Sequence, residues 1–152
     1  MHIVKQYARS DASTEEVSEM EARAGFSLPS DYAQFLLEWN GGKPDVGEFE
    51  FLTFIGHKQA SAVRAFPSLD RSDHYYSAHR NLDMLHGRLP RSTIPIAEDD
   101  LGNVILLELR ETGRGNIYFW DHECEGDEDP YASLSIIAPS FTEFVKQFGV
   151  SR

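Results

Sequence analysis

A chain of 152 residues is long enough for one hydrophobic core, and its hydrophobic fraction of 41% can fill that core while 26% charged residues cover the surface. The 25 acidic residues against 14 basic ones give a formal charge of −11, which argues against direct binding to DNA or RNA. Cys124 is the only cysteine, which excludes an intrachain disulfide and a zinc site built from several thiolates. We expect a single domain over residues 1–152.

The sequence carries no sign of a membrane segment. No apolar run approaches the roughly 20 residues needed to cross a bilayer. The first residues also lack the apolar stretch and the small-residue cleavage site of a secretory signal. The expected location is therefore the cytoplasm.

The first predicted helix begins after Ser13. Ser13 and Glu16 stand in the cap and third positions of a capping box, where each side chain binds an otherwise unpaired backbone N–H. Gly25 is suited to the left-handed conformation that ends a helix, because it has no Cβ. The apolar stripe of this helix is Val17, Met20 and Ala24.

The second predicted helix begins at Pro29, whose ring presets φ for a first turn. The segment Asn40-Gly41-Gly42 follows and offers three residues that tolerate positive φ where the chain must reverse. At helical spacing between these two signals, and expected in the core, are Tyr32, Phe35, Leu36 and Trp39.

The middle of the chain is less regular. Residues 49–55 are rich in aromatic and β-branched side chains, at a length typical of a strand. Within residues 57–91 the sequence predicts only a short helix, which ends at Gly87 and carries Leu82, Met84 and Leu85.

The following part of the chain predicts a series of short strands. Residues 93–97 form the first strand, and residues 104–109 form an almost wholly apolar strand buried on both faces, with a turn at 99–103 between them. A turn at 112–116, with two glycines, leads to residues 117–120, so these strands are predicted to pair as an antiparallel hairpin.

One more strand, residues 134–137, precedes the closing helix. Ser140 and Glu143 form a second predicted capping box, followed at helical spacing by Phe141, Phe144, Val145 and Phe148. The predicted fold is α+β: a single domain with a mixed, mostly antiparallel sheet flanked by N-terminal and C-terminal helices.

The order of these elements resembles that of the SUKH superfamily, which includes fungal cell-wall-assembly regulators and bacterial toxin-immunity proteins. The resemblance is spread along the chain. It is carried by Glu15 to Gly42 with Leu28-Pro29 and Asn40-Gly41-Gly42, by Ile96-Ala97 with Gly102-Asn103, by Ile117 to Asp121, and by Ala138 to Phe144. Residues 57–91 and the acidic stretch after Trp120 depart from the family pattern.

The resemblance implies a domain that acts by binding another protein and has no catalytic residues. In bacteria the implied partner is a secreted toxin domain, and many such toxins are nucleases. An intracellular regulatory scaffold, as in the fungal branch, is the alternative. The residues that carry the resemblance are expected to be structural, since the glycines end a helix and the aromatic residues fill a core.

The most acidic stretch of the chain, DHECEGDEDP, spans residues 121–130 and holds six carboxylates with no Lys or Arg. A row of carboxylates can mimic phosphates and occupy the basic groove of a nuclease. A solvated acidic turn explains the same composition, while the spacing does not fit a twelve-residue calcium loop. The candidate partner-binding residues here are Asp121, Glu123, Glu125, Asp127, Glu128 and Asp129, with Trp120 as an aromatic anchor.

A second acidic group precedes Gly102-Asn103 and consists of Glu98, Asp99 and Asp100. Adjacent residues in a turn point in different directions, which argues against paired acid–base catalysis. The composition instead fits a turn in which Asp and Asn bind their own backbone. Any exposed carboxylate here would extend the acidic face, so these three residues are added to the candidate binding set.

Four histidines lie in the middle of the sequence: His57, His74, His79 and His86. Their spacing fits no zinc motif. His122 and Cys124 are too few for a structural zinc site. No nucleophile-elbow or phosphate-loop motif is present either. We therefore expect no catalytic residues, no metal and no other cofactor, and a basic protein, such as a toxin domain, as the partner.

Overall fold

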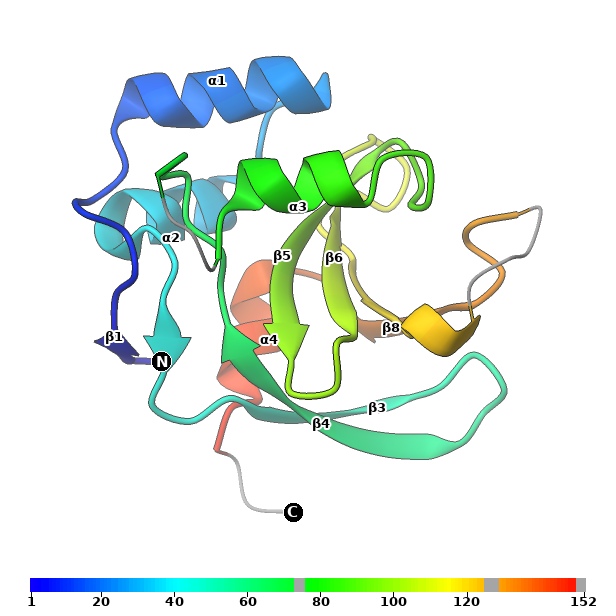
Figure 1. The fold of residues 1–152 in the computed structure, drawn as a ribbon. Helices are drawn as coiled ribbons and strands as arrows, with labels where there is room; N and C mark the ends of the chain where they lie inside the picture. The colour runs from blue at the N-terminus through cyan, green and yellow to red at the C-terminus, as the bar shows by residue number, and fades with distance from the viewer. Residues whose placement is uncertain (73–75, 125–128, 150–152) are drawn as a thin grey trace.

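The computed structural model describes residues 1–72, 76–124 and 129–149, and it has the predicted α+β architecture (Figure 1). Its helices are α1 (Thr14–Ala24), α2 (Ser30–Trp39), α3 (Ala78–Met84), the 3-10 helix η1 (His122–Cys124) and α4 (Phe141–Lys146). Its strands are β1 (Ile3–Lys5), β2 (Lys43–Pro44), β3 (Glu48–Leu52), β4 (Lys58–Ala65), β5 (Thr93–Asp99), β6 (Val104–Glu108), β7 (Ile117–Trp120) and β8 (Leu134–Ala138). None of the helices in these described ranges has the length and apolar character needed to cross a membrane.

The main sheet is a six-stranded meander in which each strand pairs with the next along the chain, from β3 to β8. Every ladder between the named strands is antiparallel, including the predicted hairpin of β6 and β7. The sheet curls so far that its outer strands β3 and β8 also contact each other. β1 and β2 form a separate two-stranded sheet.

Both predicted helix starts near the ends of the chain are confirmed by their caps. The Ser13 Oγ accepts from the Glu16 N–H at 3.1 Å, and a carboxylate oxygen of Glu16 accepts from the Ser13 N–H at 3.0 Å. At α4 the Ser140 Oγ accepts from the Glu143 N–H at 3.1 Å, which is one of the two bonds of the predicted capping box. Because these bonds join residues three apart in sequence, they could be recognised without knowledge of the tertiary structure.

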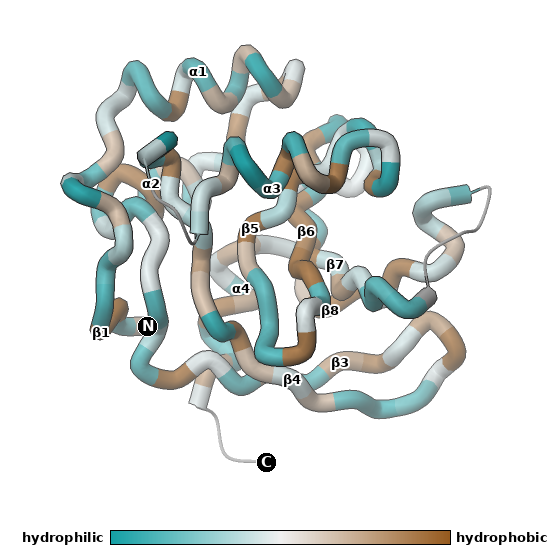
Figure 2. Tube along the Cα trace, in the orientation of Figure 1, coloured by the Kyte–Doolittle hydropathy of each residue, from teal (hydrophilic) through white to brown (hydrophobic). Residues whose placement is uncertain are grey.

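The inner face of the curled sheet packs against α2 and α4 through aromatic side chains. The rings of Tyr32 and Phe141 lie 5.3 Å apart, and those of Phe49 and Phe144 lie 5.2 Å apart. In Figure 2 apolar segments run along β6 at the centre of the molecule, whereas α1 alternates between polar and apolar residues. The outer face carries a smaller cluster, in which Leu106, Trp120 and Leu134 are buried under the chain that follows α3 and under Tyr131.

The segment Asn40-Gly41-Gly42 joins α2 to the rest of the fold. All three residues have positive φ. The Asn40 amide donates to the carbonyl of Ser10 (3.0 Å) and accepts from the N–H of Leu69 (2.8 Å). Gly42 exchanges two backbone hydrogen bonds of 2.8 Å with Phe66. The segment that carried part of the family resemblance is therefore structural in this chain.

Residues 57–91 contain a long strand and a helix, of which the sequence predicted only the second. β4 reads KQASAVRA, and most of its side chains are small or polar, so it lacks the β-branched and aromatic signal of a strand. The predicted short helix is present as α3, with Ser77 as its cap, but it ends at Met84 rather than at Gly87. Leu85 lies just beyond its last residue.

Candidate protein-binding surface

The structure brings the two predicted acidic segments together. Asn103 ends the turn between β5 and β6, and His122 begins η1 immediately after Asp121. The Oδ1 of Asn103 lies 2.9 Å from Nδ1 of His122 and accepts from the His122 N–H at 3.3 Å. The Asn103 Nδ2 donates to Asp99, so its oxygen faces the histidine and His122 Nδ1 is the donor. We call the exposed residues at this junction the acidic corner: Asp100, Leu101, His122 and Glu123, with the partly buried Asp121.

Asp99 is buried, and its carboxylate builds the turn rather than facing a partner. Only 2% of Asp99 is exposed. It accepts from Ser61 Oγ (2.9 Å) and from the N–H groups of Leu101 (2.9 Å) and Asn103 (2.8 Å). This confirms the expectation that Asp binds its own turn, and it corrects the placement of Asp99 on the binding surface.

Glu98 is half-buried beside Asp99. Burial raises the pKa of the Glu98 carboxyl, while nearby Arg64 opposes the rise and Asp99 adds to it. The first and second residues of this acidic group are therefore largely internal. Asp100 is the one that is exposed to solvent.

The predicted aromatic anchor is also internal. Trp120 is 3% exposed and packs with Leu106 and Leu134, and the Arg88 guanidinium lies 5.3 Å from its ring centroid. The sequence does not indicate on which face of the sheet a Trp at the end of a short strand lies. The burial of Trp120 could therefore not be predicted. In the acidic corner the exposed apolar side chain is Leu101, at 77% exposure.

The remaining carboxylates of the acidic stretch lie on both sides of a gap in the described residues. Glu123 is exposed, and its N–H donates to the Asp121 carboxylate at 2.9 Å. Asp129 is exposed and accepts from the N–H of Tyr131 at 2.9 Å. The predicted residues Glu125, Asp127 and Glu128 lie outside the described residues.

Just beyond the acidic stretch, Tyr131 binds a carboxylate that sequence reasoning missed. Glu108, the last residue of β6, is completely buried, and its Oε1 accepts from the Tyr131 hydroxyl at 2.6 Å. The Ser92 hydroxyl lies 2.8 Å from the same phenol oxygen, and the Arg110 guanidinium lies 4.3 Å from the Tyr131 ring centroid. The available signal was a single Glu in the apolar run VILLEL.

The protonation state of Tyr131 supports this contact. Burial and the hydrogen bond to Glu108 raise the pKa of Tyr131 to about 12, so the phenol remains a donor at neutral pH. Two bonds thus hold the acidic stretch, one near its start and one just after its end. His122 is bound to Asn103, and Tyr131 is bound to Glu108.

Replacing Tyr131 by Phe tests the second of these bonds. The ring would still pack, but a buried carboxylate would lose its hydroxyl donor, which costs about 1–3 kcal/mol of unfolding free energy. Urea unfolding of wild type and Tyr131→Phe measures this cost. Tyr7→Phe is the matched control, since Tyr7 makes ring contacts while its hydroxyl has no hydrogen-bond partner among the described residues. Equal unfolding midpoints for the two variants would contradict a role for the Glu108 contact.

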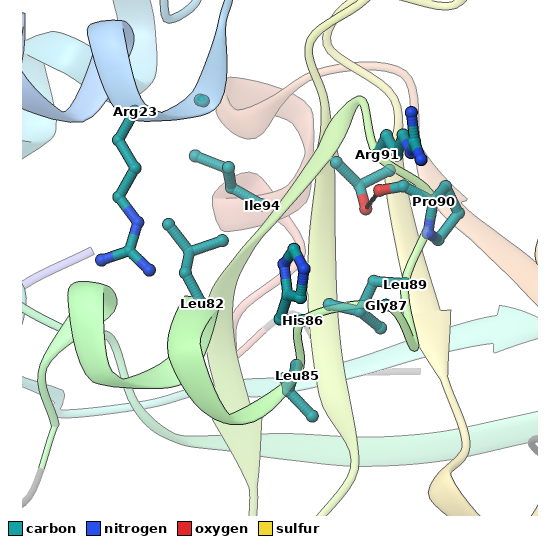
Figure 3. A pocket seen from close by; sticks show the side chains of 11 residues that line it. Arg23, Leu82, Leu85, His86, Gly87, Leu89, Pro90, Arg91 and Ile94 are labelled. Carbon is teal, nitrogen blue, oxygen red and sulfur yellow. Dashed lines mark hydrogen bonds between the residues drawn. The ribbon is translucent and has the colours of Figure 1, made fainter.

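A cavity of about 330 Å³ lies between the end of α1, the end of α3 and the start of β5 (Figure 3). Its lining includes Arg23, Arg91 and His86, together with apolar side chains such as Leu82 and Ile94. No described residue in this lining is a carboxylate. The guanidinium of Arg23 is paired with the Asp83 carboxylate, which lies outside this lining.

The histidines that crowd together in sequence have different surroundings in the structure. His57 lies in the turn between β3 and β4, while His86 lines the cavity. His79 is 4% exposed and its Nδ1 lies 3.2 Å from the Arg23 guanidinium; burial lowers its pKa, as do Arg71 and Arg23. His74 lies outside the described residues. Across the described ranges, no three His, Cys, Asp or Glu side chains are grouped so that they could hold a metal ion.

Comparison with known families places this fold. The model of the SMI1/KNR4 family (SUKH-1) matches residues 11–147, a range that contains the acidic corner and both points at which the acidic stretch is held. The chain belongs to this family. A relative from Bacillus subtilis (strain 168), the SPbeta prophage-derived uncharacterized protein YokK, is 32% identical over 145 residues, which cover 86% of this chain and 71% of the relative. The SUKH-1 assignment agrees with the resemblance drawn from the sequence.

Proposed function

We propose that this SUKH-1 domain is a non-enzymatic, cytoplasmic immunity protein that binds and neutralises a cognate polymorphic toxin, with a nuclease as the leading candidate. The observation that carries the proposal is the acidic corner, where the pairing of Val104 with Trp120 and the bonds between Asn103 and His122 hold two acidic segments together. The family supports a protein partner. The charge indicates that the partner is basic.

The electrostatics favour a partner that itself binds nucleic acid. A nuclease presents Lys and Arg to the phosphates of its substrate, and exposed carboxylates at a fixed position can occupy the same groove. The formal charge of −11 adds long-range attraction to such a partner. Leu101, exposed beside Asp100, supplies an apolar contact among the charges.

A regulatory scaffold that binds endogenous proteins is the second candidate. Membership of the SMI1/KNR4 family supports it, because the SUKH superfamily that the sequence resembles includes fungal cell-wall-assembly regulators. The relative from Bacillus subtilis favours the immunity role instead, since the family resemblance implies immunity proteins in bacteria and regulatory scaffolds in fungi. The two functions differ in one measurable way, because only an immunity protein restores growth to a cell that makes the toxin.

Co-expression tests the proposal directly. Toxin domains encoded beside the gene are induced in a host that also makes this chain, and growth is scored. We expect rescue by the wild type. We expect weaker rescue by the corner variant, which carries Asp100→Asn and Glu123→Gln in the acidic corner and Asp129→Asn beyond it. The control, called the N-terminal variant, removes the same charge from exposed positions in and just before α1, through Asp11→Asn, Glu15→Gln and Glu19→Gln.

Three results would contradict parts of this proposal. No rescue by any neighbouring toxin, together with pull-down of endogenous regulators, would favour the scaffold. Rescue without physical binding would contradict neutralisation by contact. Equal loss of rescue in the corner variant and the N-terminal variant would show that net charge acts without regard to its position.

A further inference from the structure

The turn between β3 and β4 exposes several large apolar side chains. We call residues 52–57 the hairpin tip. Leu52 is 62% exposed, Phe54 is 48% exposed and Ile55 is 63% exposed. Other exposed apolar residues, such as Val4, Met84 and Leu101, lie singly along the described sequence. Three apolar side chains within four residues indicate an interaction site rather than ordinary surface composition.

Backbone groups of the hairpin tip make several hydrogen bonds within the turn. The apolar side chains are therefore carried by an ordered turn. The N–H of Thr53 donates to the carbonyl of His57 (2.7 Å), and the N–H of Gly56 donates to the carbonyl of Thr53 (2.8 Å). The Thr53 hydroxyl oxygen accepts from the N–H of His57 at 3.0 Å. An ordered tip loses little conformational entropy when a partner covers it.

The hairpin tip is attached to the strand that follows the acidic stretch. The Phe54 N–H donates to Ser135 Oγ at 2.9 Å. The residue before Ser135 in β8 pairs with Trp120, which directly precedes Asp121. In Figure 1 the far end of the β3–β4 hairpin and η1 lie at the same end of the molecule. The apolar tip and the acidic corner can therefore face one partner.

We propose that the hairpin tip is the apolar anchor of the interface with the toxin, and that it inserts into an apolar recess beside the partner's basic surface. This inference rests on the proposed function. Charge complementarity identifies the occupant. A second copy of this chain would bring its own carboxylates against those of the first, and an anionic membrane surface would repel them. At the base of the tip, Lys58 and Glu50 pair at 3.3 Å and neutralise each other.

The two parts of the interface have separate kinetic effects. Carboxylates act at a distance and raise the association rate, whereas apolar groups act only on contact and slow dissociation. Replacing two tip residues, by Leu52→Thr and Ile55→Thr, keeps strand-forming side chains while removing apolar area. We expect dissociation to become about tenfold faster or more, with the association rate and its salt dependence unchanged.

Surface plasmon resonance with the toxin domain encoded beside the gene, made inactive by substitution, measures both rates. The matched control is Val4→Thr with Met84→Gln, which changes two apolar residues of similar exposure away from the tip. Thermal unfolding checks that all variants are folded. Faster dissociation of the tip variant alone would support the inference.

Other outcomes overturn it in distinguishable ways. Dissociation of the tip variant at the wild-type rate removes the tip from the interface and leaves the proposed function standing. Absence of any binding by the wild type overturns both proposals. If analytical ultracentrifugation shows a wild-type dimer that the tip variant loses, the occupant is a second copy of the chain and the inference is wrong.

Discussion

Replacing Gly41 by Ala is expected to lower the free energy of unfolding by about 3 kcal/mol or more, because backbone strain and overpacking add together. Gly41 has φ +80°, a conformation that side chains with a Cβ rarely adopt. A Cβ there would also lie 2.5 Å from the carbonyl oxygen of Phe66 and 2.6 Å from that of Pro67. These atoms belong to the backbone and cannot rotate away, so the hydrogen bonds between Gly42 and Phe66 would be disturbed.

Gly25→Ala separates the two causes. Gly25 has nearly the same φ, +82°, but no atom lies within 4 Å of its added Cβ. Its replacement should therefore cost only the backbone term, about 1–2 kcal/mol. Urea unfolding of both variants measures the difference. If the two variants lose the same stability, close packing at Gly41 is not what makes glycine necessary there.

Neutralising the acidic stretch should slow association with a basic partner about tenfold or more at low salt, and should flatten the dependence of that rate on salt. The variant replaces five carboxylates with the corresponding amides, at Glu123, Glu125, Asp127, Glu128 and Asp129. Its stability should stay within about 1 kcal/mol of wild type, because exposed charges such as those of Glu123 and Asp129 contribute little to folding. Stopped-flow or surface plasmon resonance measurements at several salt concentrations test the rate.

A charge-matched control decides whether position matters. It removes five exposed carboxylates from the first third of the chain, at Asp11, Glu15, Glu19, Glu38 and Glu48. A smaller effect in the control would assign the steering to the acidic stretch. Wild-type association in the first variant would instead place the binding face elsewhere.

The helices α1, α2 and α4 could be predicted from the sequence because their signals are local. The capping box at Ser13 and the apolar spacing of α2 involve residues within one or two helical turns. β4 was missed because its sequence is mostly small and polar, and β1 because it is defined by pairing with β2, about 40 residues later. Pairing over that distance leaves no local pattern.

The candidate surface was predicted in composition but not in arrangement. Both acidic groups were recognised, but their contact was not: it follows from the antiparallel register that pairs Val104 with Trp120, to which Asn103 and His122 add a hydrogen bond. The burial of Asp99 and Trp120 follows from which face of the sheet each side chain occupies, and short strands do not reveal this. The role of Glu108 could not be predicted, because its partner Tyr131 lies 23 residues away in sequence and no local pattern joins the two residues.

The two bonds that hold the acidic stretch involve other residues than the carboxylates proposed to bind a partner. Hydrogen bonds at His122 and Tyr131 fix the flanks, and neither bond uses the side chain of a carboxylate lying between them. Substitutions from residue 123 to 128 therefore leave both bonds intact, and under the proposed function they can change which partner is bound. If the chain is an immunity protein, as proposed, a lineage that meets a changing toxin can revise this stretch repeatedly without first evolving a new scaffold.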